Sequence, residues 1–148
     1  MGLIEELRGQ RICLDTAPII YFIEEHEIYR NILRPVFVEI DSGNIEAITS
    51  TITLLEVLVH PLRTGNETLA HKYREILLSS ANLMTFEISH EISAMASRLR
   101  AKYSIRTPDA IQMAVGIQYG AADFLTNDPN LKKVSEIKVF VLADYASK

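Results

Sequence analysis

Short apolar runs alternate along the chain with longer segments in which apolar residues recur three or four positions apart. A short apolar run bounded by polar or turn-forming residues is typical of a buried strand. Runs of this kind lie at residues 11–14, 45–48, 83–86, 124–126 and 137–142. We therefore expect a sheet of about five strands.

The segments between these runs have the spacing of helices with one buried face. Pro18 suits the first turn of one helix, and Ser89 is placed to cap another. Further helices are expected at 29–41, 53–59, 67–79 and 107–119. Pro61 and Gly65 are expected to stop the 53–59 helix, and Gly120 to end the last one.

Strands that alternate with helices predict a parallel sheet covered on both faces. The expected fold is α/β, a three-layer α/β/α sandwich around a central, twisted parallel sheet. The chain has 148 residues, 48% of them hydrophobic, and no repeat, low-complexity segment or linker divides it. We therefore expect a single domain over residues 1–148.

The chain shows no membrane or export signal. No apolar run approaches the roughly 20 residues that span a bilayer, and residues 1–10 lack the basic start and apolar core of a signal peptide. We expect a soluble, cytoplasmic protein with no membrane partner. The lone Cys13 lies in an apolar run, so we expect a buried strand residue rather than a disulfide or a cysteine metal site.

Several carboxylates follow the predicted strands at the same edge of the sheet. Asp15 ends the first strand, Asp128 lies just past the fourth, and Glu56 sits in the helix after the second. Ligands of parallel α/β sheets bind at the carboxyl ends of the strands. Glu56 also interrupts an apolar helix, where an ionised carboxylate must be solvated, paired or bound to a metal. These acids predict a shared pocket.

Each acid also has an ordinary structural explanation. Asp15 could cap the next helix, Asp109 follows Pro108 in a first helical turn that favours negative charge, and Asp128 lies in an Asn-Asp-Pro turn. Glu56 could belong to a polar helix stripe. The joint placement on one rim favours a site, although the position of Asp109 does not follow from strand order.

Carboxylates that share a pocket repel one another unless a cation is present. Ligand sets made only of oxygen suit Mg²⁺ or Mn²⁺. One such ion can polarise a phosphoryl oxygen and help to deprotonate a water, and a second can stabilise the leaving oxygen. The sequence leaves open whether one or two ions bind.

The order of four short motifs resembles the PIN domain, specifically the VapC-like toxin ribonucleases. The motifs are Leu14-Asp15-Thr16, Thr53-Leu-Leu-Glu56-Val-Leu, Thr107-Pro-Asp109-Ala-Ile and Leu125-Thr-Asn-Asp128. The resemblance covers nearly the whole chain. Each motif is short, and only their order and spacing together make the match specific.

This resemblance implies a PIN-like fold and a metal-dependent endoribonuclease that hydrolyses RNA phosphodiester bonds, as the toxin of a type II toxin–antitoxin pair. It also implies that Asp15, Glu56, Asp109 and Asp128 are the catalytic, metal-binding acids for Mg²⁺ or Mn²⁺. Thr16 and Thr126 would support them, although a helix cap and a strand-end turn explain these two equally simply. Many members of the family are homodimers that a small antitoxin protein inhibits.

Cationic residues near the acids are candidates for RNA contact, because positive charge supplies affinity for a phosphate backbone. Arg106 lies three residues before Asp109, and Arg63 is a second, exposed candidate. For Arg98 and Arg100 we favour a solvated helix face. The net charge of −4 argues against a nucleic-acid partner, unless bound cations offset clustered acids.

Other interpretations remain open at this stage. The chain could be a PIN-fold module that binds RNA or protein without turnover, an RNA-processing nuclease outside a toxin–antitoxin pair, or a nuclease of structured DNA. Asp123 lies at the opposite end of the fourth strand from Asp128 and is excluded from the site. His60 is expected to end its helix. Apolar residues near Ile32, Val36 and Phe37 are the candidate surface for self-association.

Overall fold

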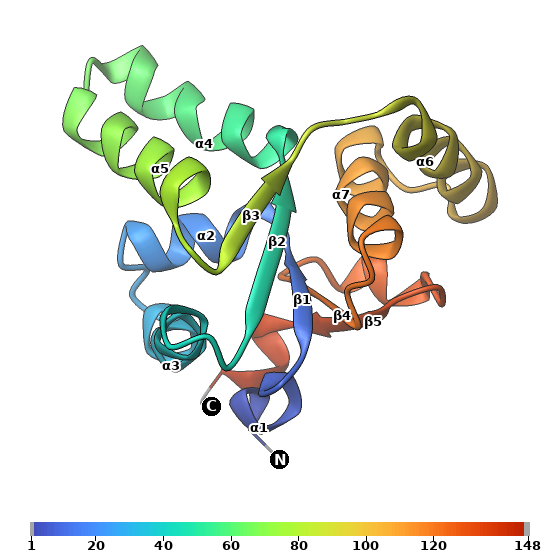
Figure 1. Cartoon of the computed structure of the whole chain (residues 1–148), viewed down its shortest axis with the longest axis horizontal. Coiled ribbons are helices and arrows are strands. Elements are labelled where there is room, and N and C mark those ends of the chain that lie inside the picture. The colour runs from blue at the N-terminus through green and yellow to red at the C-terminus, as the bar shows by residue number, and fades with distance from the viewer. Residues whose placement is uncertain (1, 147–148) are drawn as a thin grey trace.

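A five-stranded parallel sheet forms the centre of the computed structural model, which describes residues 2–146 (Figure 1). Its strands are β1 (Arg11–Leu14), β2 (Glu46–Ser50), β3 (Leu83–Phe86), β4 (Asp123–Thr126) and β5 (Lys138–Val141). They lie in the order β3-β2-β1-β4-β5, and every neighbouring pair is parallel. The order changes direction between β1 and β4, and a crevice forms at the carboxyl ends of strands at such a point.

Helices cover both faces of the sheet, as expected for a three-layer α/β/α sandwich. Figure 1 shows α2 (Thr16–Ile23), α3 (Arg30–Asp41), α4 (Thr51–Thr64) and α5 (Glu67–Ser79) on one side of the strands, and α6 (His90–Tyr103) and α7 (Thr107–Gln118) on the other. Alternate strand residues face opposite layers. Ile12 and Leu14 of β1 join the core beneath α2 and α3, whereas Cys13 joins the core beneath α6 and α7.

The remaining elements are short. Helix α1 (Leu3–Leu7) precedes β1 and was not predicted, because its amphipathic pattern spans little more than one turn. Two 3₁₀ helices, η1 (Pro129–Lys133) and η2 (Leu142–Tyr145), flank β5. Within residues 2–146, none of the helices combines the length and the apolar character that crossing a bilayer requires.

Helix α4 is longer than predicted, and the expectation that Pro61 stops it was wrong. The helix begins at Thr51, directly after the Ser50 cap, and continues through Pro61 to Thr64. A proline inside a helix removes one backbone hydrogen bond, and here the proline is a buried residue of α4. Gly65 ends the helix as expected, with a left-handed φ of 72° that a residue without Cβ adopts at no steric cost.

The predicted apolar surface on α3 is not available for self-association. Val36 and Phe37 are buried, and Ile32 packs against the same core. The ring of Phe37 stacks on Phe22 with centroids 4.0 Å apart. The apolar face of α3 is therefore used to cover the sheet, and its exposed apolar residue is Val38.

Helix α7 lies unusually close to β1. A Cβ added at Gly116 would come within 2.9 Å of the Cβ of Cys13 and 3.0 Å of Ile137 Cδ1. Real Cβ atoms do not approach other atoms so closely, so glycine at this position lets the helix lie against the strand. Cys13 is buried there as predicted. The close contact sets the height of α7 above the sheet and with it the position of its first turn.

Candidate active site

A cleft of about 430 Å³ lies at the carboxyl ends of β1 and β4, where the strand order changes direction. Its walls come from α2, α4, the start of α7 and the segment after β4. The lining residues are Asp15, Thr16, Ala17, Ile20, Glu56, Arg106, Asp109 and Asp128. The structure thus places all four predicted acids, together with Thr16 and Arg106, around one cavity.

Asp15 is held by two hydrogen bonds from different elements. As the N-cap of α2, it accepts the backbone N–H of Thr16 at Oδ1, at 2.8 Å. Its Oδ2 accepts the hydroxyl of Thr126 at 2.7 Å. Thr126 ends β4 and is fully buried. Asp15 therefore caps α2, as considered from the sequence, and also lines the cleft.

Glu56 reaches the cleft from α4. The helix starts directly at the end of β2, so its second turn lies above the rim of the sheet. The hydroxyl of Thr16 donates to Glu56 Oε1 at 2.6 Å. Thr16 therefore lies between two acids, with its backbone bound to Asp15 and its side chain bound to Glu56.

Asp109 and Asp128 form the other side of the cleft. Asp109 stands in the first turn of α7, where Nε of Arg106 lies 3.4 Å from its Oδ2. The Asp109 side chain is 14% exposed and that of Arg106 75%. Asp128 donates its backbone N–H to Thr126 Oγ1 at 3.1 Å and accepts the N–H of Asn130 at Oδ1. The turn around Asp128 is thus tied to the same threonine that holds Asp15.

Burial and mutual repulsion disfavour charge in the cleft. Burial is the main cause that raises the pKa of Asp15, and the Glu56 carboxylate adds to it, while hydrogen bonds from Thr126 and Thr16 oppose the rise. Burial also raises the pKa of Asp109 to about 6, with further contributions from Asp15, Asp128 and Glu56. Arg106 lowers the pKa of Asp109 without cancelling these effects. The cleft therefore favours a bound cation.

A buried polar network beneath the acids was not predicted. Gln112, on α7, is 1% exposed and accepts a hydrogen bond from the hydroxyl of Ser50 while its amide N–H groups donate to Thr53 and Thr16. Thr49 donates to the carbonyl of Leu14 at 2.9 Å. The signal for Gln112 was present in the sequence, because it interrupts an apolar run as Glu56 does.

Other residues considered from the sequence lie outside the cleft. Arg63 is exposed near the end of α4, two helical turns beyond Glu56, and does not line the cavity. His60 is exposed on the same helix, and the expectation that it ends the helix was wrong, because α4 continues to Thr64. Arg98 and Arg100 are exposed on α6, as expected for a solvated face. Asp123 begins β4 at the opposite edge of the sheet, and its buried Oδ2 has no hydrogen-bond partner within the described residues.

The site and the fold define an α/β protein with an acidic cleft at the switch point of a parallel sheet. The model of the PIN domain family matches residues 12–137, so the chain belongs to the PIN domain family. Among curated protein sequences, no match to this chain was found.

Solved structures share this fold. VapBC2 from Rickettsia felis, bound to a DNA fragment from its promoter, matches with 20% identity and a TM-score of 0.68, covering 88% of this chain and 98% of that one. A toxin–antitoxin complex from Klebsiella pneumoniae matches with 18% identity and a TM-score of 0.63, covering 88% and 97%. The sarcin–ricin loop cleaving toxin VapC20 of Mycobacterium tuberculosis has 16% identity and a TM-score of 0.68, covering 86% and 98%. The PIN-like α/β fold is thereby confirmed.

The residues present suit a hard divalent cation. The donors in the cleft are carboxylate and hydroxyl oxygens, which such ions prefer. No three Asp, Glu, His or Cys side chains among residues 2–146 are arranged to hold a metal ion directly. Mg²⁺ commonly keeps several waters and takes only one or two carboxylates itself, so a spaced set of acids is compatible with it.

Proposed function

We propose that this chain is a metal-dependent endoribonuclease that hydrolyses RNA phosphodiester bonds, and that it is the toxin of a type II toxin–antitoxin pair. The observation that carries the proposal is the convergence of Asp15, Glu56, Asp109 and Asp128 on one cleft at the switch point of the sheet. PIN domain membership supports a nuclease, and similarly folded VapC-type toxins support the toxin context.

Each residue of the cleft has a role in this proposal. Asp15, Glu56, Asp109 and Asp128 would hold one or two Mg²⁺ or Mn²⁺ ions, which when bound polarise a phosphoryl oxygen and favour deprotonation of an attacking water. Thr16 and Thr126 keep Glu56 and Asp15 in place through hydrogen bonds of 2.6 and 2.7 Å.

Arg106 is the RNA contact that the structure favours. It is 75% exposed and lies at the mouth of the cleft beside Asp109. A phosphate that approaches the acids would therefore meet this guanidinium first. Arg63 lies on the face of α4 that carries Glu56, seven residues or about 10 Å further along the helix, so a longer RNA strand could reach it. These two cations would supply local positive charge for a phosphate backbone on a chain whose net charge is −4.

Cleavage of a mixed RNA pool tests the proposed activity. Wild-type protein should cut RNA with Mg²⁺ or Mn²⁺ and leave 5′-phosphate ends. With a chelator it should give no cleavage products. Asp15→Asn should abolish cleavage without unfolding the protein. Asp41→Asn is the matched control, because Asp41 is exposed at the end of α3, away from the cleft, and should cut as wild type does. RNA binding without any metal-dependent product would instead identify a binding module.

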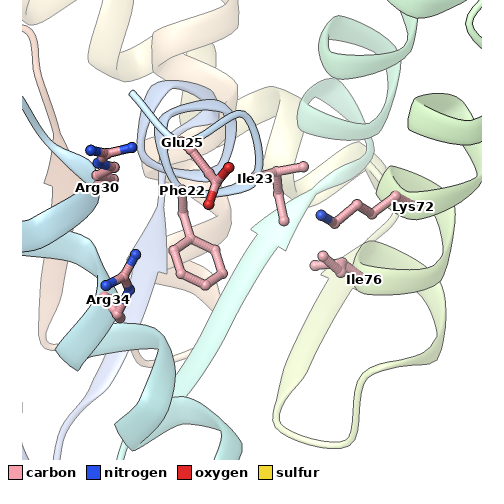
Figure 2. Close-up of a pocket in the computed structure, with 7 residues that line it drawn as sticks. All are labelled: Phe22, Ile23, Glu25, Arg30, Arg34, Lys72 and Ile76. Carbon is pink, nitrogen blue, oxygen red and sulfur yellow. The ribbon is translucent and has the colours of Figure 1, made fainter. Parts of the chain in front are cut away.

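The proposed antitoxin partner has a candidate docking pocket at the end of α2, the helix whose first turn lines the cleft. A cavity of about 300 Å³ is lined by Phe22, Ile23, Glu25, Arg30, Arg34, Lys72 and Ile76. Figure 2 shows the Phe22 ring between the arginines of α3 and the Lys72 and Ile76 side chains of α5. None of the three cations forms an ion pair within residues 2–146. The pocket therefore suits an acidic, amphipathic segment of the inhibitor.

Charge reversal tests this docking pocket. Arg34→Glu with Lys72→Glu should leave RNA cleavage intact and weaken inhibition by the proposed antitoxin. Arg74→Glu, on the same helix but outside the pocket lining, is the control. Equal inhibition of both variants would refute this pocket as the docking site.

We also propose that residues 1–148 form one domain that assembles as a homodimer through α4. Leu55, Val59 and Leu62 are 62%, 42% and 48% exposed, and their spacing puts them on one stripe of the helix. An exposed apolar stripe is typical of an association surface. Light scattering should give a dimer for wild type and a monomer for Val59→Glu, whereas a wild-type monomer would refute the homodimer.

A further inference from the structure

One buried amide connects the elements that carry three of the four acids. Gln112 lies one helical turn after Asp109 on α7. Its Oε1 accepts the hydroxyl of Ser50, which caps α4, the helix of Glu56. Its Nε2 donates to Thr53 of α4 and, at 3.4 Å, to Thr16 of α2. Asp15 is the residue that caps α2.

The hydrogen count determines the direction of these bonds, because each hydroxyl has a single hydrogen to donate. The Glu56 carboxylate accepts, so the hydrogen of Thr16 points to Glu56 Oε1. Thr16 can then only accept from Gln112, which the amide nitrogen allows.

The amide is oriented by contacts at both ends. Ser50 Oγ accepts the backbone N–H of Ile52 and donates its own hydrogen to Gln112 Oε1. A reversed amide would turn an oxygen toward Thr16, whose hydrogen already points to Glu56, and this bond would be lost. In the observed arrangement, donation runs from Gln112 through Thr16 to Glu56.

We propose that Gln112 is a positioning residue that holds Thr16 and Glu56 in the arrangement required to bind the divalent ion. The inference rests on the proposed function. Gln112 itself does not line the cleft, so it acts from beneath it, through Thr16, through the placement of α2, α4 and α7, and through a weaker interaction with Asp15. Residues that orient metal ligands in this way typically contribute 10- to 100-fold to metal affinity or activity.

Gln112→Met tests the proposal, because methionine has nearly the same length and volume but no amide. Calorimetric titration with Mn²⁺ should show a 10- to 100-fold weaker affinity, and the Mn²⁺ concentration for half-maximal RNA cleavage should rise by a similar factor. Combining Gln112→Met with Thr16→Val should weaken Mn²⁺ binding little more than Thr16→Val alone, since both changes interrupt the same path.

Val115→Ala is the matched control for lost stability. Val115 is fully buried on the same helix but packs in the apolar core beneath α6 and α7. It should lower the melting temperature in chelator while keeping the wild-type affinity for Mn²⁺. If Gln112→Met binds Mn²⁺ as tightly as Val115→Ala, Gln112 is only structural and the inference is overturned. If the wild-type protein itself binds no Mn²⁺, the proposed function fails, and the inference fails with it.

Discussion

Asp109→Asn should stabilise the metal-free protein at neutral pH while it abolishes cleavage. The charged carboxylate of Asp109 is surrounded by Asp15, Asp128 and Glu56, and burial adds to their repulsion. Its single nearby cation, among the described residues that influence it, is the exposed Arg106. Asparagine has the same shape without the charge, so it removes an unfavourable interaction from the folded state. Loss of this proposed metal ligand should remove the proposed activity at the same time.

The magnitude follows from the pKa. The pKa of Asp109 rises from that of an ordinary aspartate to about 6 in the folded protein. This shift corresponds to at most about 3 kcal/mol of lost folding stability when Asp109 is charged. Water in the open cleft screens part of the repulsion, so we expect about 1–2 kcal/mol of added stability. For a chain of this size that corresponds to a rise in melting temperature of roughly 2–6 °C.

The pH dependence has a definite sign. A carboxyl whose pKa is raised in the folded state binds protons more readily there than in the unfolded chain. The wild-type protein therefore gains stability from Asp109 as the pH falls through about 6 and towards about 4, where both states are protonated. The gain in folding stability of Asp109→Asn over the wild type should be largest near pH 7.5 and should disappear by about pH 4.

Thermal unfolding in chelator, measured across this pH range for both proteins, tests the reasoning. Added Mn²⁺ should stabilise the wild type more than the variant, because binding to the folded state adds stability that grows with the logarithm of 1 + [Mn²⁺]/Kd, and the variant has the larger Kd. A melting temperature for Asp109→Asn equal to or below that of the wild type at neutral pH would show that Asp109 is not destabilised by its neighbours.

Three further predictions concern residues that hold the cleft in place or lie at its mouth. Thr126→Val removes the hydrogen bond to Asp15 and leaves the N–H of Asp128 without its acceptor, so denaturant titration should show a loss of about 1–3 kcal/mol and cleavage should fall by roughly tenfold or more. Gly116→Ala forces α7 away from Cys13, and the same titration should show a loss of about 1–3 kcal/mol. Arg106→Ala should weaken binding of an uncleavable RNA uniformly across sequences, with a salt dependence reduced by about one phosphate contact.

The sequence was sufficient for the parts of the fold that depend on local pattern. Strands β1 and β3 have the predicted bounds, and Ser89 caps α6 through a hydrogen bond from the N–H of Ile92. The end of α4 was misjudged because helix-breaking at a proline depends on what surrounds it, and Pro61 is buried in the folded protein. The surface predicted on α3 failed for a related reason. An apolar helix face does not reveal whether it packs against its own sheet or against another molecule.

The acids that follow strands could be placed from topology, whereas Gln112 could not. Asp15 and Asp128 lie beyond the ends of β1 and β4, which are neighbours in the sheet. The amide of Gln112 lies beneath them, and its partners on α2 and α4 are distant in sequence. A polar residue in an apolar run signals only that a partner exists. Finding that partner requires the relative placement of three helices, which no single segment specifies.

From the sequence, Asp109 was assigned to the site mainly through family resemblance, yet the architecture also accounts for its position. Helix α7 leads directly into β4, and a helix that returns the chain to the start of a parallel strand must begin at the opposite edge of the sheet. The first turn of α7 therefore lies at the carboxyl ends of the strands, beside Asp15 and Asp128. Gly116 then brings the helix close to β1. The same physical argument that places the strand-end acids thus places the helix-start acid, once the direction of the connecting helix is taken into account.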